Sequence, residues 1–215
     1  MINSEQLFTL LGITMYVVLG VIALWGAFCV ITVWRRVAQK RFRSEQAMMA
    51  FLQQVEEPLA QGDFNGAMHV CDGDQRAVPQ LVMLALENRR IGFAKVRQLI
   101  LDRFERDVLA DLEHRLSWVN TVIKSAPMVG LLGTVVGMMG AFEQLPTAKN
   151  PAADLATNIS LALITTACGL SIAIPLVLCA ASINVRIRKM EDLVTFALSR
   201  FLEVYRQALG DHQQR

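Results

Sequence analysis

Three long apolar runs constrain the fold of this chain more than any other feature of its sequence. They extend from Leu7 to Trp34, from Ser125 to Phe142 and from Leu155 to Val185, and none contains a charged residue or a histidine. About 20 apolar helical residues cross the hydrocarbon core of a bilayer, so each run predicts one transmembrane helix. The third run is longer than one crossing requires, so its helix must tilt or protrude.

Composition agrees with a membrane protein. Hydrophobic residues make up 53% of the 215 residues, and the mean hydropathy is +0.38. The formal net charge is only +2, which provides no basic field for nucleic acid. We therefore expect membrane lipid, and no nucleic acid, among the partners.

Basic residues at the ends of the runs predict the topology, because Lys and Arg concentrate on the cytoplasmic side. They follow the first run, precede the second and follow the third, whereas the ends on the other side are poor in them. The predicted order is an external N-terminus (1–6), transmembrane helix 1 (7–34), a cytoplasmic helical domain (35–121), transmembrane helix 2 (122–142), an external loop (143–154), transmembrane helix 3 (155–185) and a cytoplasmic helical tail (186–215). No cleavage pattern precedes the first run, so we expect it to be retained.

The charged segments also have helical patterns. Apolar residues recur at steps of three and four in the tail (Ile187, Met190, Val194, Ala197, Phe201, Val204, Ala208) and before the second run (Leu101, Phe104, Val108, Leu112, Leu116, Val119). No strand pattern occurs. The predicted fold is an all-α membrane protein whose second and third transmembrane helices continue as long helices into a helical cytoplasmic domain, with shorter helices between Arg43 and Asn88.

Small residues line one face of each of the last two runs. Gly130, Gly133, Gly137 and Gly140 fall at steps of three and four, and Ala162 and Gly169 belong to a similar face of the third run. Such faces let helix backbones approach closely, which predicts helix packing and an oligomer interface. Packing within one chain is the alternative. Pro127 and Pro175 lie inside the runs and predict helix kinks.

Hydroxyl groups are the polar feature of these two runs. Thr134 lies beside the glycines, and Thr166, Thr165 and Ser160 lie in the third run. A single membrane threonine can simply bond a carbonyl one turn back. Thr134 and Thr166, at matching depth on small-residue faces, instead favour a shared polar route for a small ion.

No catalytic or metal site is indicated. The chain has no phosphate-binding loop, nucleophile elbow or zinc-protease motif, and His69 with Cys71 supplies only two potential ligands. We expect neither an enzyme nor a cofactor. Proton transport across a membrane normally needs a titratable group. Since the runs hold no acid or histidine, a proton path would require a second chain.

The motifs of the second and third runs resemble those of the ExbB/TolQ/MotA proton-channel family. Residues 133–139 after Pro127 are similar to its second-span motif, and residues 159–170 with Pro175 are similar to its third-span motif. Three spans resemble ExbB and TolQ more than MotA. The resemblance implies a bacterial inner-membrane protein with a periplasmic N-terminus and a cytoplasmic C-terminus, in which Thr134 and Thr166 line the pore.

The resemblance further implies a homopentamer around two single-span partners like ExbD or TolR, whose membrane Asp carries the proton. The output would pass through TonB-like proteins to outer-membrane import or through Tol proteins to envelope constriction. One position departs from the pattern, because Leu161 stands where ExbB and TolQ usually have Glu. A threonine-lined path without a fixed acid is also compatible with sodium as the transported ion. The competing hypotheses are a structural membrane scaffold and a self-sufficient transporter.

Overall fold

The computed structural model describes residues 4–42, 44–145 and 151–213. Every regular element in this part of the chain is helical, and no strand is present in it. Three of the helices are long and apolar enough to cross a membrane. The predictions of an all-α fold and of three such helices are confirmed.

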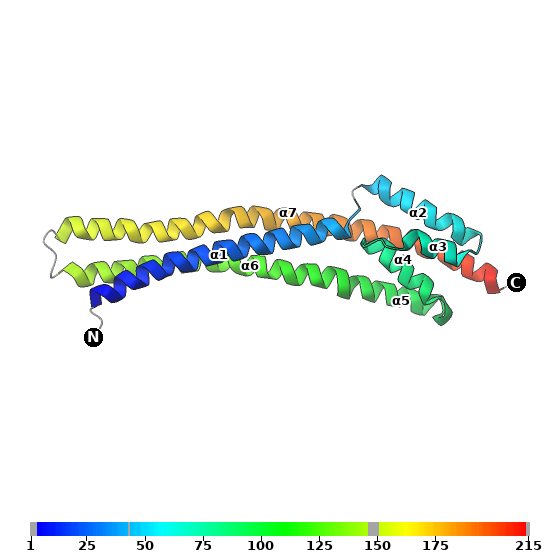
Figure 1. The fold of residues 1–215 in the computed structure, drawn as a ribbon, viewed down its shortest axis with the longest axis horizontal. Coiled ribbons are helices and arrows are strands. Elements are labelled where there is room, and N and C mark those ends of the chain that lie inside the picture. Colours follow the sequence, from blue (N-terminus) through cyan, green and yellow to red (C-terminus); the bar gives the residue numbers. More distant parts are fainter. Residues whose placement is uncertain (1–3, 43, 146–150, 214–215) are drawn as a thin grey trace. The chain divides into compact units, whose positions relative to one another are not determined.

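Two of the long helices extend well beyond the apolar runs. Helix α1 spans Ser4–Lys40, α6 spans Ala110–Gln144, and α7 spans Pro151–Gln213 (Figure 1). A π-helix, η2 (Phe104–Leu109), joins α6 to α5 (Phe93–Arg103) without a break. Both the second and the third apolar run therefore lie in continuous helices that continue into charged sequence. Pro127 lies inside α6 and Pro175 inside α7; the kinks expected there stay predictions.

The chain divides into two compact units. We call the described residues of 1–32 and 115–182 the apolar unit, and those of 33–114 and 183–215 the polar unit. In the apolar unit, α6 and α7 are antiparallel, since Gly130 lies against Thr166 and Gly137, further along α6, lies against Ala162. Helix α1 joins them where Gly26 meets side chains of both helices.

The polar unit is built from short helices around the ends of the long ones. They are α2 (Glu45–Ala60), α3 (Phe64–Cys71), α4 (Ala77–Glu87) and the 3₁₀ turn η1 (Arg89–Ile91), followed by α5 and η2. The side chains of Ser44 and Asp63 accept the bonds that begin α2 and α3, as expected of N-cap residues. Gly62 and Gly73 follow the ends of α2 and α3 with positive φ, which glycine adopts without strain.

The core of the polar unit uses the tail stripe and the first part, up to Leu112, of the stripe before the second run, with two shifts. Most members of both stripes are buried, but Leu101 is 40% exposed and Ile100 is buried in its place. Val204 is only half-buried, and the neighbouring Tyr205 is fully buried and donates to the carbonyl of Ala85 at 3.3 Å. Arg200 also forms a bidentate ion pair with Glu56, in which two guanidinium nitrogens donate to the two carboxylate oxygens at 2.6 and 2.8 Å.

Candidate functional site

The contact between α6 and α7 depends on residues without bulky side chains. A Cβ added to Gly130 would lie 2.8 Å from the carbonyl oxygen of Thr165 and 3.0 Å from the Cα of Thr166. One added to Gly169 would lie 2.6 Å from the carbonyl oxygen of Ala126. The two distances to carbonyl oxygens, 2.8 and 2.6 Å, are shorter than a carbon–oxygen contact allows. The two backbones therefore approach this closely only because positions 130 and 169 are glycine.

The same contact continues toward the loop end of the two helices. A Cβ on Gly133 would lie 2.7 Å from the hydroxyl oxygen of Thr165, and one on Gly137 would lie 2.9 Å from the Cβ of Ala162. Gly140 is buried beyond them. The predicted small-residue faces therefore meet each other within one chain, while the oligomer interface expected of them stays a prediction.

Thr165 fixes the two helices to each other. Its side chain is 4% exposed, and its hydroxyl lies 3.0 Å from the carbonyl oxygen of Gly130 on α6 and 2.7 Å from that of Ala162 on its own helix. Thr134 is also buried, and its hydroxyl donates to the carbonyl of Leu131 at 2.6 Å. Both groups are thus satisfied by backbone oxygens, as threonines in membrane helices often are.

Thr166 differs from both. Its hydroxyl oxygen is buried and, among the described residues, has no hydrogen-bond partner. Leaving a buried hydroxyl unpaired costs about 1–3 kcal/mol. The group therefore occupies a position in which a further polar partner, such as water, an ion or another chain, would lower the free energy.

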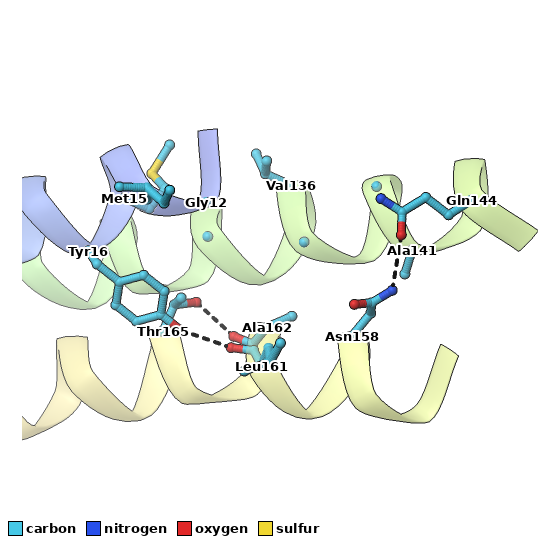
Figure 2. A pocket seen from close by; sticks show the side chains of 14 residues that line it. Gly12, Met15, Tyr16, Val136, Ala141, Gln144, Asn158, Leu161, Ala162 and Thr165 are labelled. Atoms are coloured by element: carbon cyan, nitrogen blue, oxygen red, sulfur yellow. Dashed lines mark hydrogen bonds between the residues drawn. The ribbon is translucent and has the colours of Figure 1, made fainter. Parts of the chain in front are cut away.

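A cavity of about 300 Å³ lies among the three helices of the apolar unit. Helix α1 contributes Gly12 and Tyr16 to its lining, and α7 contributes Thr165 (Figure 2). Helix α6 contributes Gly133 and Gly137. Figure 2 shows the Tyr16 hydroxyl directed at the backbone of α7, where it donates to the carbonyl oxygen of Leu161 at 3.2 Å. Closer to the loop, the amide of Asn158 donates to the Gln144 side chain at 3.4 Å.

Two other predicted site residues, Ser160 and Pro175, are exposed and do not line this cavity. Leu161 lines the cavity but is 53% exposed. The ion-path roles expected of Ser160 and of the threonines stay predictions. Tyr16, Asn158 and Gln144 also line the cavity, although the sequence patterns did not predict them as site residues. A tyrosine within the first charge-free run was the available signal for Tyr16.

These features define a multi-span membrane protein in which α6 and α7 meet through glycines, alanines and the buried hydroxyl of Thr165. Residues 81–195 match the model of the MotA/TolQ/ExbB proton channel family. The match covers more than half of the chain, and the chain belongs to this family.

Individual relatives agree with this assignment. A protein of Methanothermobacter thermautotrophicus named as a biopolymer transport protein ExbB homolog is 31% identical over 161 residues, which cover 74% of this chain and 56% of that protein. A Helicobacter pylori protein named ExbB-like 2 is 34% identical over 54% of this chain and 75% of its own length. The Tol-Pal system protein TolQ of Haemophilus influenzae is 36% identical over 47% of this chain and 46% of its own length. The chain thus spans about half the length of the first and third of these relatives.

Proposed function

We propose that this chain is the multi-span subunit of an ion-driven complex in the bacterial inner membrane, with α6 and α7 forming part of the ion path. Protons are the proposed ion, and work at the outer membrane is the proposed output, as in ExbB-type energisers of TonB-dependent import. A TolQ-type role in envelope constriction is the second candidate, since relatives with both names match the chain.

One observation carries this proposal: Thr166 has a buried hydroxyl without a partner, beside the glycines where α6 and α7 touch. A structural scaffold gains nothing from such a group, because an apolar side chain of the same shape avoids the cost of the unpaired hydroxyl. An ion path gains a polar group that becomes paired when water or an ion arrives.

The proposed complex contains further chains. The three apolar runs contain no acid and no histidine, so the carboxylate that binds the proton comes from a single-span partner like ExbD or TolR. Several copies of this chain, five in the proposed assembly, surround that partner. With Leu161 in place of an acid, the route relies on Thr134, Thr166 and the partner's carboxylate.

The test compares Thr166→Val with two control variants. The complex is purified with its co-purifying partner and reconstituted into vesicles, and proton uptake is followed with a pH-sensitive dye. Thr166→Val should abolish uptake while its thermal stability is unchanged or increased, because the substitution removes an unpaired buried hydroxyl at nearly constant volume.

The controls separate the path from helix packing. Thr165→Val removes the hydroxyl that joins α6 and α7 and should lower thermal stability, by about 1 kcal/mol per lost bond. Thr157→Val changes an exposed threonine near the start of α7 and should alter neither property. Normal proton uptake by a stable, partner-bound Thr166→Val complex would reject the proposed role.

A further inference from the structure

A second pocket lies in the polar unit, where the apolar runs of α1 and α7 give way to charged sequence. Its volume is about 240 Å³, and α1 and α7 contribute Trp34, Arg41 and Arg186 to its lining. Trp34 is the last residue of the first apolar run, and Arg186 directly follows the third. Both helices therefore change from apolar to basic at this pocket.

The two arginines present unused donors to this pocket. The Arg186 guanidinium lies over the Trp34 ring, 4.1 Å from its centroid, an arrangement that leaves the in-plane N–H groups free to bind. Arg41 donates through its Nε to the carbonyl of Phe42 at 3.2 Å, which leaves its two terminal nitrogens. No carboxylate pairs with either guanidinium in the described part of the chain.

Apolar surface adjoins the same pocket. Val37 and Ile183 are buried along its lining, whereas the lining residue Trp34 is 38% exposed. Val185, which precedes Arg186 in the sequence, is 54% exposed. Tryptophan is enriched where membrane helices pass through the headgroup region. A free phosphate ion would use only the arginines, but a lipid would also cover the apolar surface with its acyl chains.

We propose that this pocket binds the phosphate headgroup of an anionic phospholipid such as phosphatidylglycerol. Arg41 and Arg186 donate to the phosphate oxygens, as planar guanidinium groups do with good geometry. The volume is below the roughly 300–1,000 Å³ typical of pockets for whole small molecules. It suits a headgroup whose acyl chains remain outside, consistent with basic pockets between membrane helices that bind lipid headgroups.

Lipid retention by the full-length protein tests this site. The protein is purified in mild detergent and titrated with phosphatidylglycerol or phosphatidylcholine, and bound lipid is counted by native mass spectrometry. The wild type should retain phosphatidylglycerol in preference to phosphatidylcholine. Arg41→Gln combined with Arg186→Gln should weaken that binding about tenfold or more, because two charge-assisted contacts are lost.

A matched pair controls for general surface charge. Arg35→Gln combined with Arg188→Gln removes the same charge from two exposed positions of α1 and α7 outside the pocket, and it should keep most of the binding. Ala38→Phe keeps both arginines but fills the pocket, and it should weaken binding as the Arg41/Arg186 pair does. Excess inorganic phosphate should not displace the lipid from the wild type.

Several results would overturn the proposal. Equal losses in the two arginine pairs would mean that charge alone attracts the lipid. Full binding by the Ala38→Phe variant would place the lipid elsewhere. Equal retention of the two lipids would remove the anionic preference, and displacement by inorganic phosphate would make a free anion the ligand.

Discussion

Thr165 and Thr166 are adjacent on α7, but their hydroxyls affect the stability of the α6–α7 contact in opposite directions. The Thr165 hydroxyl lies within bonding distance of two carbonyl oxygens, one on each helix, and so stabilises the α6–α7 contact. The Thr166 hydroxyl is equally hidden from solvent but is unpaired among the described residues. One hydrogen bond makes a net contribution of about 1 kcal/mol to the stability of the fold, and an unpaired buried group costs about as much or more. The Thr166 hydroxyl therefore does not stabilise the α6–α7 contact as the Thr165 hydroxyl does.

Cys71 gives a prediction at the same scale, outside the apolar runs. Its side chain is 3% exposed, and burial, reinforced by nearby Asp74, raises the pKa of its thiol to about 12. Only the thiolate reacts with alkylating agents, and the exposed thiol has a pKa of about 8.5. At neutral pH the thiolate fraction of Cys71 is therefore roughly three-thousandfold lower than that of an exposed thiol. Alkylation of native Cys71 should be correspondingly slow, as measured by mass spectrometry over time.

The reactivity test has a control in the same unit. In a variant whose other cysteines are replaced, Gln61→Cys introduces an exposed thiol just after α2, which should react at the rate of a free peptide. Denaturant should bring Cys71 to that rate. Rapid alkylation of Cys71 in the folded protein would contradict the burial described for α3.

Among the helices, the α6–α7 contact yields the sharpest prediction. Gly130→Ala and Gly169→Ala each place a methyl group against a backbone carbonyl, 2.8 and 2.6 Å away, and a backbone atom cannot rotate aside. Overpacking of this kind costs about 1–3 kcal/mol. Each variant should therefore show a lower unfolding temperature in detergent.

Gly20→Ala is the matched control for these substitutions. Gly20 lies in α1, and apart from its own helical turn no atom lies within 4 Å of an added Cβ. Alanine also favours a helix more than glycine does. Its unfolding temperature should be unchanged or slightly raised. A similar fall in all three variants would mean that the glycines matter for a reason other than the close approach of α6 and α7.

The register of the helices was harder to predict from the sequence than their existence. The stripe before the second apolar run was expected to include Leu101, yet Ile100 occupies the buried position. The cause is η2, a π-helix whose hydrogen bonds reach one residue further than those of an α-helix, so that steps of four stay on one face. The residue types in Phe104–Leu109 carry no signal that predicts a π-helix there.

For the molecule as a whole, composition and charge pattern predicted the three long apolar helices and the all-α class. The glycine spacing predicted small-residue faces, but periodicity cannot say which neighbour such a face meets. The contacts of Gly130 and Gly169 supply that answer, since they join α6 to α7 of the same chain. The Tyr16 contact with Leu161 was likewise beyond prediction, because it depends on how α1 lies against α7.

The orientation in the membrane is the last prediction, and it follows from the basic residues at the ends of the apolar runs. With the N-terminus outside, position 153 before the third run lies outside and position 61 lies inside. In a background without the four native cysteines, Ala153→Cys should react with a membrane-impermeant maleimide in intact spheroplasts. Gln61→Cys should react only after the membrane is opened. Both positions are exposed, so both should react in detergent. The reverse pattern in spheroplasts would invert the proposed topology and place the phosphatidylglycerol pocket in the outer leaflet.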